Sequence, residues 1–126
     1  MLNTSDLMLN NPKSVAPDTS VQDAKSLMES EQVMQLPVLQ QDRLIGIITE
    51  RDLCLSIHSP NKNDLTVGDC MTADPITVTP ETPVFRTAQM LSTYKFGALP
   101  VVNGNKLVGL ITTNLLLAYF ASKWDK

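Results

Sequence analysis

The residues of this chain best suited to chemistry are Thr49 and Asp52, a threonine and an aspartate separated by two positions. They follow the apolar run Gly46-Ile-Ile, where a strand is expected to pass into a helix. One carboxylate can accept hydrogen bonds from both hydroxyls of a ribose, and charge-assisted bonds of this kind are stronger than neutral ones. Arg51 adds a cation, and a helix N-terminus favours a phosphate. The segment predicts a nucleoside clamp, although Thr-x-x-Asp also fits a capping box that stabilises a helix without ligand.

The clamp lies within a sequence repeat with an offset of 63 residues. Residues 69–120 align with residues 6–57 without a gap, so that Leu-Pro-Val at 99–101 covers Leu-Pro-Val at 36–38. One copy is too small to bury its own apolar face. We therefore predict an α+β fold of two tandem β-α-β-β-α repeats that pack through their sheets with pseudo-twofold symmetry. Repeat 1 spans residues 1–58, a polar linker spans 59–65, and repeat 2 spans 66–126.

Both repeats show the same order of local patterns. A short strand, predicted at Lys13–Val15 and at Ile76–Val78, precedes an amphipathic helix. The helices carry apolar residues at helical spacing, namely Val21, Ala24, Leu27 and Met28 in one and Val84, Ala88 and Leu91 in the other. Paired apolar strands follow, at Leu36–Leu39 with Leu44–Ile48 and at Leu99–Val102 with Leu107–Ile111. Their turns are predicted at Gln40–Arg43 and at Asn103-Gly104.

Repeat 2 lacks the carboxylate of the clamp. Leu115 stands at the position of Asp52, and Asn114 lies one residue early. Because one residue turns a helical side chain by about 100°, Asn114 is not expected to replace the aspartate. Any nucleoside is therefore expected to bind preferentially to the segment with Asp52.

The composition narrows the classes of function. Thirteen acidic and ten basic residues give a net charge of −3, which argues against nucleic-acid and anionic-membrane partners. The longest apolar run, Leu115–Ala121, is much shorter than the roughly 20 residues of a membrane span, so a cytoplasmic protein is expected. Cys54 and Cys70 are expected to be reduced thiols, and His58 has no carboxylate partner in sequence. We therefore expect no enzyme activity, no metal site and no required cofactor.

The ordered set of motifs resembles the cystathionine-β-synthase (CBS) domain family, and its tandem arrangement is similar to a Bateman module. The matching elements are Asp-x-Met at 6–8 and 69–71, Leu-Pro-Val in both repeats, and the glycine-to-aspartate phrase at 46–52. Each motif alone is weakly specific, but the set recurs at a constant offset. The resemblance covers about residues 5–121.

The resemblance implies two clefts, each combining the Thr-x-x-Asp segment of one repeat with strands of the other. The main cleft would contain Thr49, Arg51, Asp52, Pro75, Ile76, Thr77, Thr82, Phe96, Gly97, Ala98 and Pro100. There Phe96 would contact adenine, unless it is simply a core residue. The weaker cleft would contain Lys13, Ser14, Thr19, Val33, Met34, Gln35, Thr112 and Leu115. Lys13 is either a phosphate contact or a solvated side chain.

The resemblance also implies a regulatory module that binds AMP, ADP, ATP or S-adenosylmethionine and signals to an unidentified protein by a change of conformation. The partner would be either a separate protein or another part of a longer polypeptide, and Met1, which precedes repeat 1 closely, favours the separate protein. The segment 115–124 is apolar almost all round, with Leu116, Phe120 and Trp124 in line, which favours a homodimer over a helix buried in a monomer. The alternative is a structural dimerisation module with empty clefts, because repeat 2 shows that the fold does not require the aspartate.

Overall fold

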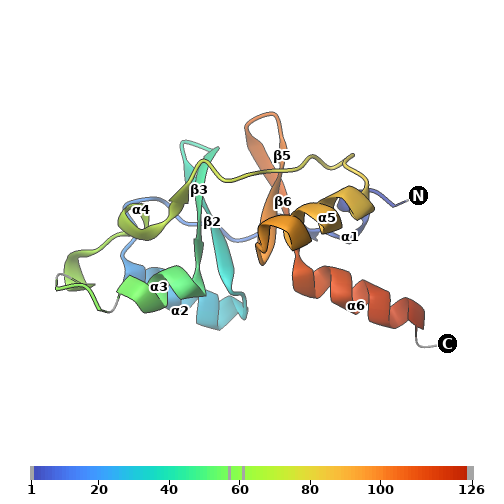
Figure 1. The fold of residues 1–126 in the computed structure, drawn as a ribbon. Helices are drawn as coiled ribbons and strands as arrows, with labels where there is room; N and C mark the ends of the chain where they lie inside the picture. Colours follow the sequence, from blue (N-terminus) through green and yellow to red (C-terminus); the bar gives the residue numbers. More distant parts are fainter. Residues whose placement is uncertain (1, 57, 61, 125–126) are drawn as a thin grey trace. The chain divides into compact units, whose positions relative to one another are not determined.

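The computed structural model describes residues 2–56, 58–60 and 62–124 (Figure 1). Met1 and residue Asn61 of the predicted linker lie outside the described residues. Helices and short strands alternate along the chain, which confirms the α+β class. In chain order they are α1 Thr4–Leu7, β1 Leu9–Asn10, α2 Val21–Glu31, β2 Gln35–Gln40, β3 Arg43–Thr49, α3 Glu50–Ser56, the 3₁₀ helix η1 Lys62–Asp64, α4 Val67–Cys70, β4 Thr72–Ala73, α5 Val84–Tyr94, β5 Ala98–Asn103, β6 Lys106–Thr112 and α6 Thr113–Trp124.

The chain forms two compact units whose boundaries differ from those of the sequence repeat. The contiguous unit is Lys13–Pro75, and the two-segment unit joins Met1–Pro12 to Ile76–Lys126. The first segment of each repeat therefore packs with the other repeat: β1 pairs with β6, and β4 pairs with β3. The boundaries at 58 and 66 describe the sequence repeat, and the packing of the repeats through their sheets with pseudo-twofold symmetry stays a prediction.

The contiguous unit has an antiparallel sheet in the order β2-β3-β4. Helix α2 begins after Ser20, whose hydroxyl accepts the Asp23 N–H at 3.0 Å, and it ends at Gln32 in the left-handed conformation. The predicted apolar face is confirmed, because Ala24 and Met28 are buried. These side chains form one core with residues of the sheet, α3 and α4, namely Leu36, Val38, Ile48, Leu53 and Val67.

The two-segment unit repeats this plan with the sheet order β1-β6-β5. Its core contains Val78, Leu91, Leu99, Val101 and Ile111, against which Leu115 and Leu116 of α6 pack. The N-terminal segment of this unit, which contains α1 and β1, is held to the rest by a buried hydrogen bond of 2.7 Å between the hydroxyls of Thr4 and Thr87. The N–H of Thr4 also donates to the carbonyl of Thr82 at 2.8 Å.

The Asp-x-Met motifs hold the first segment of each repeat against the sheet of the other repeat. Met71 lies against Gly46 of β3, and Met8 lies against Gly109 of β6. A Cβ at either glycine would collide with the methionine sulfur and also with a carbonyl oxygen of the neighbouring strand. Glycine is therefore required at positions 46 and 109, the first residue of each Gly-x-x-Thr phrase, so that the segment with the methionine can pack closely.

The aspartates of the same motifs cap the short helices that precede the methionines. Asp6 Oδ2 accepts the Asn3 N–H at 2.7 Å, and Asp69 Oδ2 accepts the Thr66 N–H at 2.9 Å. The Thr66 hydroxyl donates to the same oxygen of Asp69 at 3.0 Å. These hydrogen bonds lower the pKa of Asp69 below its ordinary value of 3.8.

Two predicted strands are wrong in extent. Of Lys13–Val15 only Val15 forms a bridge, with Val38, and of Ile76–Val78 only Val78 forms one, with Val101. Prolines at 12, 17, 75 and 80 bound these stretches, and a residue without an N–H cannot extend a ladder.

The observed positions of the two hairpin turns agree with the predicted positions to different degrees. The first turn is at Gln41-Asp42, inside the predicted range, with both residues at positive φ. The second falls one residue later than predicted, because Asn103 pairs with Lys106 and Gly104 is therefore the first turn residue, with φ of 65°. Among the described residues no helix is long and apolar enough to span a membrane.

Candidate functional site

The clamp residues sit at the junction of β3 and α3. Thr49 Oγ1 accepts the Asp52 N–H at 3.1 Å, and Asp52 Oδ2 accepts the Thr49 N–H at 2.9 Å. This reciprocal pair is a capping box, so the cap that the sequence allowed is formed. Both residues are only partly exposed. The box holds the hydroxyl and the carboxylate in fixed positions at the start of the helix.

The capping box leaves part of each side chain available to a ligand. The Thr49 hydroxyl accepts a bond in the box, and it retains its own hydrogen for donation. The capping box uses Oδ2 of Asp52, and among the described residues no hydrogen bond to its Oδ1 is found. Capping and ligand binding are therefore compatible in this geometry.

The strand β2 lies beside the clamp. Gln35 is opposite Thr49 in the β2–β3 register, and the Glu50 N–H donates to the Met34 carbonyl at 2.8 Å. Met34 is exposed, with a relative solvent accessibility of 53%. The contiguous unit thus brings the clamp next to residues that were predicted for the weaker cleft.

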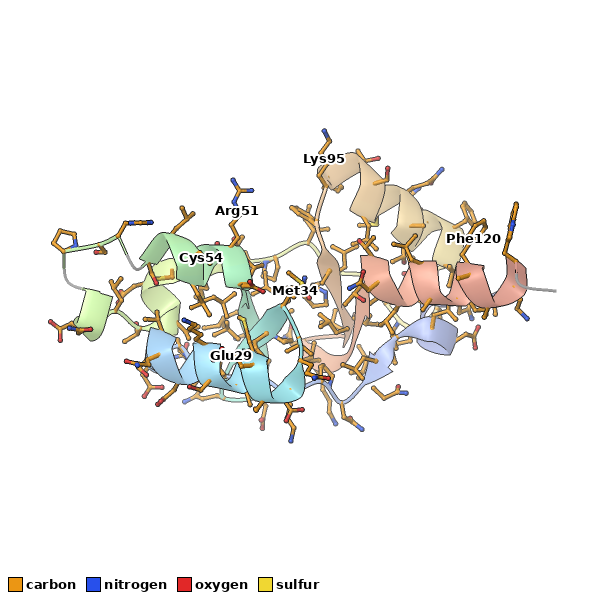
Figure 2. All side chains as sticks on the ribbon, turned by 90° about the horizontal axis from the view of Figure 1, so that it is seen from below. Glu29, Met34, Arg51, Cys54, Lys95 and Phe120 are labelled. Atoms are coloured by element: carbon orange, nitrogen blue, oxygen red, sulfur yellow. The ribbon has the colours of Figure 1, made fainter. Side chains whose placement is uncertain are left out.

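Arg51 and the cysteines occupy distinct environments near the clamp. Figure 2 shows the Arg51 side chain extending away from α3, and within the described part of the chain it makes no ion pair. Cys54 is exposed on the same helix, and both cysteines are free thiols, as expected. Burial raises the pKa of the Cys70 thiol, and the carboxylates of Asp69 and Asp52 raise it further. The Asp52 carboxylate therefore acts electrostatically on Cys70, while Arg51 remains available to an anion.

The corresponding junction in the two-segment unit has only half of the cap. Thr112 Oγ1 accepts the Leu115 N–H at 3.0 Å, and the Thr113 N–H donates to the Gly97 carbonyl at 3.0 Å. Leu115 packs against the core, and its side chain has no polar group to offer a ligand. Ala98 lies opposite Thr112 in the β5–β6 register.

Phe96 does not belong to the core of its unit. It is 41% exposed, and its ring stacks on Tyr94 with a centroid separation of 5.6 Å and an interplanar angle of 19°. Lys95 between them has φ of 58°, which ends α5 and brings the two rings to one side. Tyr94 was not among the residues predicted from the sequence, although an aromatic residue two positions before Phe96 was the available signal.

The other predicted residues of this unit differ in exposure. Ile76 is 39% exposed and Gly97 is exposed, whereas Ala98 and Pro100 are buried. Thr82 accepts the Thr79 N–H through its hydroxyl at 3.0 Å, within the turn before α5. The exposed residues are therefore the ones that can contact a ligand directly.

Each predicted cleft draws residues from both units. The contiguous unit contains Thr49, Arg51, Asp52 and Pro75 of the main cleft and Lys13, Ser14, Thr19, Val33, Met34 and Gln35 of the weaker one. The two-segment unit contains Ile76, Thr77, Thr82, Phe96, Gly97, Ala98 and Pro100 of the main cleft and Thr112 and Leu115 of the weaker one. The convergence of these residues into clefts stays a prediction.

Two sequence relatives differ in how much of their length the chain matches. An inosine-5′-monophosphate dehydrogenase from Korarchaeum cryptofilum is 38% identical over 99 residues, which are 78% of this chain and 20% of that protein. The CBS domain-containing protein YhcV from Bacillus subtilis is 29% identical over 112 residues, which are 88% of this chain and 80% of YhcV. The chain thus spans about a fifth of the dehydrogenase and most of YhcV.

Solved structures of similar chains contain adenosyl ligands. The crystal structure of CBSX2 in complex with AMP has a TM-score of 0.86 at 31% identity, over 98% of this chain and 99% of that one. The CBS domain pair of protein MJ0100, in complex with 5′-methylthioadenosine and S-adenosyl-L-methionine, has a TM-score of 0.89 at 25% identity, over 98% of both chains. The CBS domain family model matches residues 5–59 and 67–122. The chain therefore belongs to the CBS domain family and contains the domain twice.

Proposed function

We propose that this chain is a regulatory module that binds an adenosyl compound at the Thr49–Asp52 clamp and signals to a partner protein by a change of conformation. The observation that carries the proposal is the capping box, which fixes Asp52 while leaving Oδ1 without a protein hydrogen bond among the described residues. The complexes of CBSX2 with AMP and of MJ0100 with two adenosyl ligands support it by similarity.

The proposed contacts follow from the chemistry of the free groups. The 2′- and 3′-hydroxyls of the ribose donate to Oδ1 of Asp52, and the Thr49 hydroxyl donates to an oxygen of the ligand. Arg51 is exposed and supplies a cation for a 5′-phosphate. AMP, ADP and ATP carry this phosphate, whereas S-adenosylmethionine does not. Phe96 offers an exposed ring to the base. The other main-cleft residues that the family resemblance implies are also part of the proposal, namely Pro75, Ile76, Thr77, Thr82, Gly97, Ala98 and Pro100.

The two clamp segments are proposed to differ in affinity. Thr112 lacks a carboxylate partner because Leu115 stands at the position of Asp52, and the Leu115 side chain packs against the core. Hydrogen bonds to a charged group contribute about 1.5–3 kcal/mol, or about one to two powers of ten in affinity. An adenosyl ligand should therefore bind at Thr49 and Asp52 first.

We also propose a homodimer in the cytoplasm, formed partly by α6. Leu116 packs against the core of its own unit, so the exposed stripe of α6 is Leu117, Phe120 and Trp124. Their exposed fractions are 59%, 58% and 76%, respectively. The rings of Phe120 and Trp124 contact each other with a centroid separation of 5.3 Å. Figure 2 shows Phe120 projecting from α6. A stripe of this size is stabilised when a second copy covers it.

Calorimetric titration with AMP, ADP, ATP and S-adenosylmethionine tests the binding proposal. We expect saturable binding of at least one of them, with GMP as the control for the base. Analysis of the same mixtures for hydrolysis products tests the expectation that the module is not an enzyme. If no adenosyl compound binds and the protein is dimeric, the alternative of a structural dimerisation module is the better account.

A further inference from the structure

The contiguous unit contains a hollow with a volume of about 430 Å³. Helix α2 and its cap contribute Ser20, Val21, Gln22 and Lys25, helix α3 contributes Leu53 and Ser56, and the segment before α4 contributes Asn63 and Leu65. The volume lies within the range of about 300–1,000 Å³ that small-molecule sites occupy. None of these residues belongs to the clefts predicted for a nucleotide.

The lining combines an apolar wall with polar groups. Val21, Leu53 and Leu65 form the wall, and Leu53 is only 5% exposed. Ser56 is buried and donates its hydroxyl to the Leu53 carbonyl at 2.6 Å, which leaves its oxygen as an acceptor. Lys25 is exposed and makes no ion pair within the described part of the chain.

The second repeat supplies an internal control for these residues. At the offset of 63, Gln22, Lys25 and Ser56 correspond to Phe85, Ala88 and Tyr119, respectively. The apolar wall is kept, because Val21 corresponds to a valine and Leu53 to a leucine. The apolar wall thus recurs in repeat 2, whereas the fold forms there without the cation, the amide and the small hydroxyl.

We propose that this hollow is a second small-molecule site, which binds a small organic carboxylate. Its carboxylate lies on the Lys25 ammonium group and its apolar body lies against Leu53 and Val21. A carboxylate fits these groups because Lys25 is a cation without a protein partner among the described residues, next to an apolar surface. The proposal is independent of nucleotide binding at Thr49 and Asp52.

An NMR titration of the ¹⁵N-labelled full chain tests the site, with benzoate as the probe. Benzamide is the neutral control of the same shape, and inorganic phosphate is the anion without an apolar body. We expect saturable shifts of the amide signals of Gln22, Lys25 and Ser56 with benzoate, and affinities at least tenfold weaker for benzamide and phosphate. Absence of saturable shifts at these amides up to tens of millimolar benzoate would overturn the proposal, as would equal binding of benzamide.

Two substitutions introduce the residues of repeat 2 into the hollow. Lys25→Ala changes an exposed residue, and it should weaken benzoate binding about tenfold without changing the fold. Ser56→Tyr fills the hollow and should abolish binding. Lys95→Ala removes an exposed lysine from the other unit and should leave benzoate binding unchanged. If Lys25→Ala binds benzoate as tightly as the parent protein, the site is refuted whether or not Ser56→Tyr folds.

Discussion

Replacing Asp52 separates two functions of a single carboxylate. Oδ2 accepts the Thr49 N–H at 2.9 Å and caps α3, whereas Oδ1 is the atom proposed to bind the ribose. Asp52→Ala removes both, so the free energy of unfolding should fall by about 0.5–2 kcal/mol, the usual effect of losing a cap. Affinity for AMP should fall by about 1.5–3 kcal/mol, or roughly one to two powers of ten.

Asp52→Asn isolates the contribution of the charge. The asparagine amide oxygen can accept the Thr49 N–H, so the free energy of unfolding should remain close to that of the parent protein. The hydrogen bonds to the ribose become neutral, and neutral bonds are about half as strong as charge-assisted ones. The affinity of Asp52→Asn should therefore lie between those of the parent and Asp52→Ala.

Asp69→Ala is the matched control, because Asp69 caps α4 through Thr66 in the same way. Calorimetric titration with AMP gives the affinities, and urea denaturation followed by circular dichroism gives the stabilities. Asp69→Ala should lower stability and leave affinity unchanged. The reasoning is refuted if Asp52→Ala binds AMP like the parent, or if affinity falls equally in Asp69→Ala.

Three further predictions concern stability and assembly. Gly46→Ala places a methyl group against Met71 and should cost about 1–3 kcal/mol in urea denaturation; a loss below about 0.5 kcal/mol would contradict the tight packing. The pKa of Asp69 is lowered on folding, so its stabilisation is present above 3.8 and lost as pH falls through the lower folded value. The stability gap between parent and Asp69→Ala should thus close in acid, and a constant gap would contradict this. The parent should be a dimer in sedimentation and the double variant Phe120→Ser, Trp124→Ser a monomer, whereas a monomeric parent at high micromolar concentration would exclude the dimer.

Local features were predictable from the sequence because local rules determine them. The apolar spacing of α2 placed Ala24 and Met28 in the core, and the Thr-x-x-Asp pattern gave the capping box at Thr49 and Asp52. The absence of a carboxylate at Leu115 was also visible in the sequence, and the structure shows that its side chain packs into the core.

Long-range packing was not predictable in the same way. The repeat shows that Met8 and Met71 are equivalent, but it does not show which copy of the sheet each one contacts. Met8 contacts Gly109, far away in sequence, because the first segment of the chain packs with the second repeat. The stretches around Val15 and Val78 have strand-like composition, but neighbouring prolines limit each to a single bridge. Whether the predicted cleft residues meet depends on the arrangement of the two units, which no local pattern encodes.

The most direct test of the proposed clamp is a comparison of AMP with 2′,3′-dideoxy-AMP on the parent protein and on Asp52→Ala. The ligand change removes the two hydroxyls, and the substitution removes the carboxylate that is proposed to accept them. In the parent, AMP should bind at least about tenfold more tightly than its dideoxy analogue, because the bonds to a charged group are lost. In Asp52→Ala the two ligands should bind with nearly equal affinity. An AMP preference of the same size in both proteins would show that Asp52 does not bind the ribose and serves only to cap α3.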